Sequence, residues 1–195
     1  RRFSLRKNEF SGAIPPELGK LRNLRYLSLG HNQLSGRIPS QLGNLTQLRH
    51  LLLGHNLFSG SMFSHLDNLG YIESIYLDNN QLSGSISPQL KERRQLKVLD
   101  LSENQLSGSI PSELWSNLRL ENLFLHNNRL SGAFPLLWEK TPNLHRLYLR
   151  NNQLSGEIPA SLTRLGRIVG MDIGYNCLHA TDFAILAWLE IHDPD

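Results

Sequence analysis

The chain has 195 residues, of which 19% are charged, and its formal net charge at pH 7 is +3. It contains no run of about 18 apolar residues, the length needed to span a bilayer, and its basic residues are interspersed with acidic ones. We therefore expect no membrane segment in this piece and no nucleic-acid partner. The single cysteine, Cys177, excludes an intrachain disulfide.

The first residues belong to the middle of a predicted strand, because Phe3 and Leu5 already alternate as core residues do. No signal peptide, initiator methionine or N-terminal cap precedes them. We expect this first repeat to expose a sheet edge and apolar core, and upstream sequence to lie outside the chain. When properly capped, the chain is expected to be monomeric.

From there a frame recurs every 24 residues, and in each copy closely spaced leucines precede an asparagine and more widely spaced leucines follow it. Each period predicts one strand, one turn and one return limb. Residues two apart on a strand share a face, so Leu27 and Leu29 point into the core while Tyr26, Ser28 and Gly30 point outward. The asparagines of this frame are Asn8, Asn32, Asn56, Asn80, Asn104, Asn128, Asn152 and Asn176.

The asparagine lies where the strand turns inward and buries backbone groups. A short amide carries both donors and an acceptor, so we expect each side chain to bridge adjacent turns as a structural ladder. A glycine follows four residues later in seven periods, which indicates a backbone conformation that glycine tolerates best. These glycines are Gly12, Gly36, Gly60, Gly84, Gly108, Gly132 and Gly156.

The pattern L-x-x-L-x-L-x-x-N-x-L-S-G-x-I-P resembles the plant-type leucine-rich repeat of receptor-like proteins, receptor kinase ectodomains and polygalacturonase inhibitors. Seven Leu/Phe-Ser-Gly triplets, from Phe10-Ser11-Gly12 to Leu154-Ser155-Gly156, stay in phase with the asparagines. We predict the α/β class: a solenoid over residues 1–176 with a parallel concave β-sheet. The resemblance further implies a second small sheet near the Ser-Gly segment, a twisted and curved shape, and an extracellular or cell-surface location.

The return limbs vary in the middle of the chain. The position of Leu45 holds Arg93, Asn117 and Thr141 in three successive repeats, so the core pattern lapses there. An irregular convex wall packed by tryptophan and a second docking patch are both open interpretations. The nearby departures from the frame are Trp115, Trp138 and Met62-Phe63.

Asn44 begins the only N-glycosylation sequon, Asn-Leu-Thr, on a return limb. A glycan there would leave the concave face free. The alternative is a common variant of the repeat without modification, and the sequence leaves both open.

Residues 177–195 are predicted to form a C-terminal helical cap. Thr181-Asp182 is a helix-start signal, and Asp193-Pro194-Asp195 ends the helix. Cys177 is expected to be a small buried hydrophobic residue. The tail resembles the caps of bacterial proteins with plant-like repeats. The side chains expected to cover the last repeat are Phe183, Ile185, Leu186, Trp188, Leu189 and Ile191.

Function is expected at the variable positions of the concave face, since the repeated positions are explained by folding. Exposed aromatic side chains with nearby arginines are typical of binding hot spots, and charge zoning fixes the register of a protein or peptide partner. The predicted contacts are Tyr26, His50, Tyr76, Asp78, Asp100, Phe124, His126, Tyr148 and Arg150. The acidic zone is Glu73, Asp78, Asp100, Glu103 and Glu121, and the basic start is Arg1, Arg2, Arg6, Lys7, Arg25 and Arg49.

We predict a non-catalytic module that recognises a protein or peptide ligand. The alternatives are an inhibitor that docks onto a secreted enzyme, as polygalacturonase inhibitors do, and a structural or adhesion spacer. Asp78, Ser102 and His126 share one column, but Ser102 would lie between the other two, and a hydrolytic triad needs the histidine there. His31 and His55 lie one repeat apart without a clear third ligand, so neither a metal nor a cofactor is expected.

Overall fold

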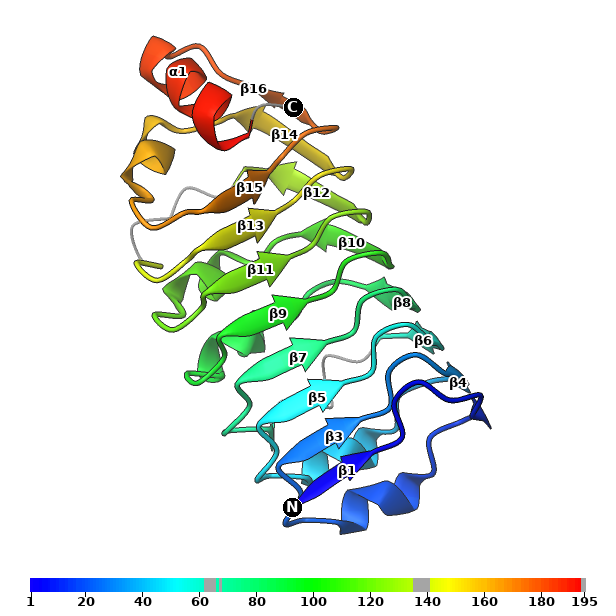
Figure 1. Ribbon diagram of the computed structural model, residues 1–195. Coiled ribbons are helices and arrows are strands. Elements are labelled where there is room, and N and C mark those ends of the chain that lie inside the picture. The colour runs from blue at the N-terminus through cyan, green and yellow to red at the C-terminus, as the bar shows by residue number, and fades with distance from the viewer. Residues whose placement is uncertain (62–65, 67, 135–140, 194–195) are drawn as a thin grey trace.

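The computed structural model describes residues 1–61, 66, 68–134 and 141–193, so the predictions for Met62, Phe63 and Trp138 lie outside the described residues. Two parallel sheets of eight strands each run along the solenoid (Figure 1). The concave sheet contains β1 (Arg2–Ser4), β3 (Tyr26–Ser28), β5 (His50–Leu52), β7 (Ser74–Tyr76), β9 (Val98–Asp100), β11 (Asn122–Phe124), β13 (Arg146–Tyr148) and β15 (Gly170–Asp172). The second sheet contains β2 (Ser11–Gly12), β4 (Gln33–Gly36), β6 (Leu57–Gly60), β8 (Gln81–Gly84), β10 (Gln105–Ser109), β12 (Arg129–Ala133), β14 (Gln153–Glu157) and β16 (Cys177–His179).

The period of the sequence sets the register of the concave sheet. Leu27 pairs with Leu51, which is 24 residues further along, and both side chains are 0% exposed. The inward side chains of every repeat form one continuous apolar cluster between the sheets and the return limbs. The solenoid, its core and the second sheet implied by the resemblance are thereby confirmed.

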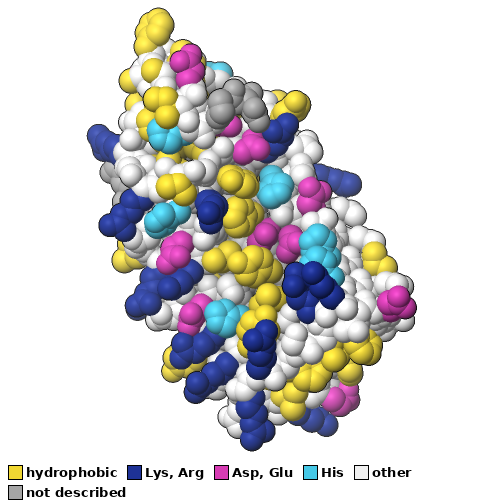
Figure 2. Space-filling view, in the orientation of Figure 1, with side chains coloured by type: hydrophobic (Ala, Val, Ile, Leu, Met, Phe, Trp, Pro, Cys, Tyr) yellow, Lys and Arg dark blue, Asp and Glu magenta, His cyan; other side chains and the backbone are white. Residues whose placement is uncertain are grey.

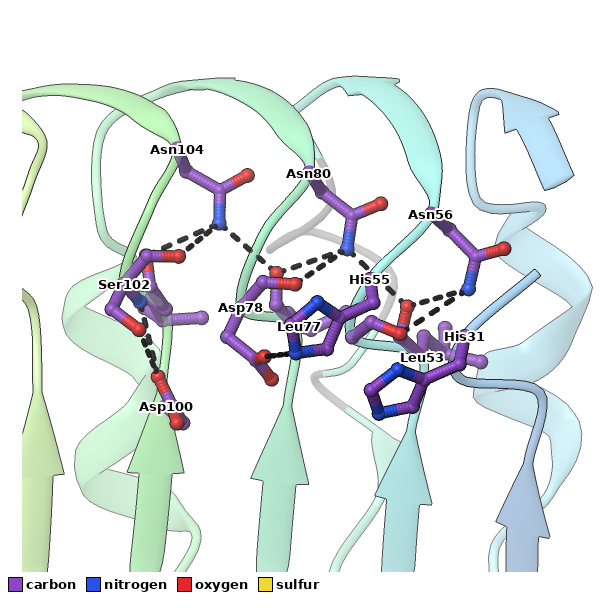
Figure 3. A network of polar contacts seen from close by, with 12 residues as sticks. His31, Leu53, His55, Asn56, Leu77, Asp78, Asn80, Asp100, Ser102 and Asn104 are labelled. Carbon is purple, nitrogen blue, oxygen red and sulfur yellow. Dashed lines mark hydrogen bonds and ion pairs between the residues drawn. The ribbon is translucent and has the colours of Figure 1, made fainter. Parts of the chain in front are cut away.

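The asparagine ladder joins each turn to the one before it. The Asn56 amide nitrogen donates to the carbonyl of Leu53 at 3.0 Å and to that of Leu29 in the preceding repeat at 3.1 Å. Its oxygen accepts the backbone N–H of Leu34 at 3.0 Å. Figure 3 shows the same arrangement at Asn80 and Asn104, so the predicted bridging role is confirmed.

Two positions of every full turn have a left-handed backbone. The predicted glycines have φ between 77° and 93°. The residue before each ladder asparagine also has positive φ, between 50° and 58°, although none of these is glycine and the sequence did not predict it. An L-residue in this region costs about 1–2 kcal/mol unless its side chain hydrogen-bonds locally. The residues are Lys7, His31, His55, Asn79, Glu103, Asn127, Asn151 and Tyr175.

The return limbs contain short 3₁₀ helices, and their polar positions belong to the core. Arg93, Asn117 and Thr141 are 9%, 2% and 0% exposed, and Trp115 is fully buried beside them. The Asn117 amide donates to the Arg93 carbonyl at 3.0 Å, so polar groups continue the buried column there. The 3₁₀ helices are η1 (Pro16–Lys20), η2 (Ser40–Asn44), η4 (Pro88–Glu92), η5 (Ser112–Ser116) and η7 (Ala160–Arg164).

Helix α1 (Phe183–His192) closes the C-terminal end of the solenoid. Asp182 caps it, since its carboxylate accepts the Ala184 N–H at 2.7 Å, as the start signal predicts. Ile185 is fully buried, and it lies against the last repeat.

Half of the residues predicted to cover the last repeat do not do so. Trp188 and Leu189 pack against the core, because they lie three and four residues after the buried Ile185 on one helix face. Phe183, Leu186 and Ile191 are 88%, 41% and 77% exposed, because they lie on the other sides of the helix. That part of the prediction is wrong.

The prediction of a buried Cys177 is also wrong. Cys177 is exposed at the start of β16, where it pairs with the exposed Ser155 of β14. β16 still pairs with β14, and thus the second sheet continues into the predicted cap.

Candidate functional site

A hollow of about 370 Å³ opens on the concave side between the first repeat and β9. Three apolar or aromatic side chains, Tyr26, Leu52 and Tyr76, combine in it with acidic and basic groups. Figure 2 shows hydrophobic side chains along the middle of this face, with histidines and carboxylates beside them. The complete lining is Arg6, Tyr26, Gly30, His31, Leu52, Gly54, His55, Tyr76, Asp78 and Asp100.

Glycine at position 54 makes room for the Asp78 side chain. A Cβ atom on Gly54 would lie 2.2 Å from the Asp78 Oδ1, so the Asp78 side chain would have to move. Gly30 lies opposite, where a Cβ would come within 3.0 Å of the Gly54 carbonyl oxygen. Gly30 and Gly54 therefore leave the base of the hollow free of side chains, next to the carboxylate of Asp78.

Histidines and carboxylates of adjacent repeats lie together in the hollow, and Figure 3 shows His55 turned toward Asp78. The His55 Nε2 lies 3.1 Å from the Asp78 carboxylate, and the Arg6 guanidinium donates to the His31 Nε2 at 3.0 Å. The two imidazoles stack at 4.1 Å with an interplanar angle of 16°. Partial burial and the neighbouring His55 and Arg6 lower the pKa of His31, which favours its neutral form.

Asp100 adds a second carboxylate to the lining of the hollow, next to Asp78. The Asp100 carboxylate accepts the Ser102 hydroxyl at 2.6 Å and the Ser102 N–H at 3.1 Å. Burial raises the pKa of Asp100, and the Asp78 carboxylate raises it further. Burial followed by Asp100 and Asp78 also raises the pKa of Tyr76, so its phenol remains a hydrogen-bond donor. The Ser102 hydroxyl is committed to Asp100, which agrees with the rejection of a triad.

A second group of aromatic side chains lies further along the same sheet. The Phe124 and Tyr148 rings meet edge to face at 5.2 Å, and the His126 ring lies 6.1 Å from that of Tyr148. The Tyr148 side chain extends over β15, where a Cβ on Gly170 would lie 3.0 Å from its hydroxyl. Arg150 lies beside this group, with its guanidinium 3.5 Å from the Asp172 carboxylate.

The remaining predicted contacts are Tyr26, which lines the hollow, and His50, whose ring lies 5.8 Å from that of Tyr26. The Arg2 guanidinium stacks over the Tyr26 ring at 4.1 Å, and the His50 Nδ1 contacts the Ser74 hydroxyl at 2.9 Å. Four side chains of the lining were not predicted as contacts: Leu52 and three that are charged or carry an imidazole. Leu52 shares the column of Tyr76, which was the available signal. The other three are Arg6, His31 and His55.

Two of the five residues of the predicted acidic zone are paired with basic side chains. The Arg49 guanidinium lies 2.7 Å from the Glu73 carboxylate, and the Lys97 ammonium lies 3.7 Å from that of Glu121. Glu73 lies one residue before β7, Glu121 lies one residue before β11, and neither lines the hollow. Ser28 also differs from its predicted outward exposure, since its short side chain lies opposite the larger Leu52 and is 0% exposed.

Within the described ranges, no three histidine, cysteine or acidic side chains come close enough to hold a metal ion. The helices in this part of the chain are also too short or too polar to cross a bilayer. The sequon residue Asn44 is exposed at the end of η2.

The family model described as a leucine-rich repeat region matches residues 1–191. A search of curated protein sequences found no match. Among solved structures, the chain is similar to the plant peptide hormone receptor RGFR1 in complex with RGF2, at 39% identity and a TM-score of 0.86. That match covers 90% of this chain and 28% of the receptor chain.

Two Arabidopsis receptor kinase ectodomains are similar over comparable lengths. GASSHO1/SCHENGEN3 in complex with CASPARIAN STRIP INTEGRITY FACTOR 2 is 32% identical with a TM-score of 0.86, over 91% of this chain and 24% of that one. HAESA in complex with an IDA peptide hormone ligand is 34% identical with a TM-score of 0.85, over 88% of this chain and 29% of that one. This chain therefore spans about a quarter of the length of these ectodomains.

Proposed function

Because the chain belongs to the leucine-rich repeat family, we propose that it is a non-enzymatic recognition module that binds a peptide segment across its concave sheet. The observation that carries the proposal is the pairing of the mixed aromatic and charged hollow at Tyr76 with the aromatic group at Tyr148 on one face. Three similar solved structures are complexes of plant receptors with a peptide hormone or factor, which supports the ligand class.

An extended peptide suits the geometry of this face. Neighbouring concave strands lie roughly 4.8 Å apart, so a segment lying across them meets one new row of side chains per repeat. The aromatic rings supply apolar area with little loss of conformational entropy, and the charges of Asp78 and Asp100 fix the register. The Ser102 hydroxyl donates to Asp100 and not to His126, which supports recognition over the triad reading of this column.

The proposal extends to location and assembly. We assign the module to the cell exterior, because the similar structures are receptor ectodomains. We assign it a single protomer and no nucleic-acid ligand; within the basic start of the face, Arg49 is paired with Glu73 and Arg2 stacks over the Tyr26 ring. A glycan at the exposed Asn44 would lie on a return limb, away from the ligand.

A displayed library of random peptides selected on the whole chain tests the proposal. Wild type is expected to enrich peptides that lose binding to a variant with Tyr76→Ser, Phe124→Ser and Tyr148→Ser. A matched control removes three exposed apolar side chains outside the face, through Leu57→Ser, Tyr71→Ser and Val169→Ser. Thermal unfolding of both variants verifies that they remain folded.

Peptides that bind the concave variant as tightly as wild type would overturn the assignment of the face. Failure to enrich any peptide, together with saturable binding of a folded secreted enzyme, would replace the peptide ligand by the inhibitor alternative. Failure of both would leave the spacer alternative.

A further inference from the structure

We propose that the flank of the solenoid between η4 and η5 is a second binding site, specific for a polysaccharide with carboxylate or sulfate groups. A hollow of about 530 Å³ lies there, at the turns that lead from the return limbs to the concave strands. Lys91, Arg94 and Arg119 line it, and Glu92 is the only acidic residue among the described lining residues. The site is separate from the concave face and does not depend on the function proposed there.

The three cations have no carboxylate partner among the residues that the structure describes. Within the described residues, Lys91, Arg94 and Arg119 take part in no ion pair, whereas nearby Lys97 lies 3.7 Å from the carboxylate of Glu121. All three side chains are exposed. Like charges gathered around one hollow repel each other, and an anionic ligand relieves that repulsion.

The polar residue that interrupts the leucine pattern holds the floor of the hollow through hydrogen bonds. Asn117 is 2% exposed, and its amide donates to the Arg93 carbonyl of the preceding turn at 3.0 Å. Its side-chain oxygen accepts the Arg119 N–H at 3.1 Å. A leucine in this position, such as Leu45, joins the core but cannot tie two turns together. The interruption therefore fixes the backbone that carries Arg119 before a ligand arrives.

The lining favours a carbohydrate over a nucleic acid. Single-stranded nucleic acids bind by stacking their bases on aromatic side chains, and no aromatic residue is among the described lining residues. Leu118 is 63% exposed at the hollow and offers an apolar surface for the face of a sugar ring. A hollow of about 530 Å³ lined by three cations suits a polymer with repeated anionic groups better than one small anion.

Binding of the whole chain to four immobilised polymers tests the proposal: polygalacturonate, dextran sulfate, neutral dextran and single-stranded DNA. The test variant is Arg94→Ser with Arg119→Ser. The matched control, Arg37→Ser with Arg129→Ser, removes two exposed arginines near the second sheet and leaves the same net charge. Neither control arginine is in an ion pair within the described part of the chain.

Wild type is expected to bind polygalacturonate or dextran sulfate, more weakly as salt concentration rises, and not to bind neutral dextran. Two surface cations contribute roughly a tenfold change in Kd, so the test variant should bind about tenfold more weakly and the control within about twofold of wild type. Which acidic polymer binds identifies a carboxylate or a sulfate ligand.

Equal losses in the two variants would overturn the site, because the attraction would then be a property of net charge alone. Absence of binding to both acidic polysaccharides would overturn it as well. A loss confined to single-stranded DNA would replace the polysaccharide by a nucleic acid. Equal thermal unfolding of the two variants verifies that neither result reflects misfolding.

Discussion

Replacing Asn56 by alanine removes one rung of the buried ladder while leaving every repeated leucine in place. The Asn56 side chain belongs to a residue that is 6% exposed, and it makes three hydrogen bonds of 3.1 Å or shorter. Two of them satisfy the carbonyls of Leu29 and Leu53, and the third satisfies the N–H of Leu34, a residue that is 7% exposed. The variant therefore leaves a buried donor without a partner.

The expected loss follows from these contacts. The two bonds to carbonyls contribute about 1 kcal/mol each, and a buried unsatisfied N–H costs about 1–3 kcal/mol. The free energy of unfolding should fall by about 3–5 kcal/mol. Asn8 provides the control, because it is exposed at the end of the ladder and donates only at 3.2 and 3.4 Å. Asn8→Ala should cost less than about 1 kcal/mol.

Urea unfolding followed by circular dichroism measures both variants. The m-value should stay unchanged if the solenoid unfolds as one unit, and a lower m-value in Asn56→Ala would show that the repeats have uncoupled. The account of the ladder fails if Asn56→Ala and Asn8→Ala lose the same free energy of unfolding.

Three further substitutions test the geometry of the concave face. Gly54→Ala places a Cβ against the Asp78 carboxylate, which can move only by leaving its contact with His55, so we expect loss of peptide binding and a fall of about 1 kcal/mol in the free energy of unfolding. Gly170→Ala meets only the movable end of Tyr148, so peptide binding in a titration should weaken while stability changes by less than about 1 kcal/mol. Asp100→Asn should stabilise the fold at neutral pH, because burial and then Asp78 raise the pKa of Asp100 in the folded state. Below the ordinary carboxyl pKa of 3.8, Asp100 is protonated in both states and the folded wild type has its full stability. That stability is lost as pH rises through the raised pKa of the folded state. The free energies of unfolding of the variant and wild type should therefore converge in acid.

The sequence was sufficient for the architecture because its signals are local and repeated. A ladder asparagine such as Asn56 meets the same surroundings in every turn, and a glycine such as Gly36 has positive φ for the same backbone reason in each one. The left-handed residue before each asparagine was missed because its side chains differ from turn to turn. His31 and Glu103 have no common chemistry that reveals their shared φ.

The burial predictions failed at the C-terminal end of the solenoid, where the last repeat has no further repeat to pack against it. Cys177 was assigned to the core by residue type, but its column is an exposed edge of the second sheet. Phe183 and Ile191 were assigned to the covering face of α1, although one helix face alone contacts the last repeat. The lining of the hollow was only partly predicted, because the place of His55 beside Asp78 depends on how neighbouring turns stack.

The most direct test of peptide recognition by the concave face is a photochemical cross-linking map. A selected peptide that carries a photoreactive residue at each position in turn is irradiated with the wild-type chain, and the attachment points are found by mass spectrometry. The account predicts attachment to side chains of the concave strands around Leu52, Tyr76 and Tyr148. Attachment confined to the return limbs or the second sheet would contradict it.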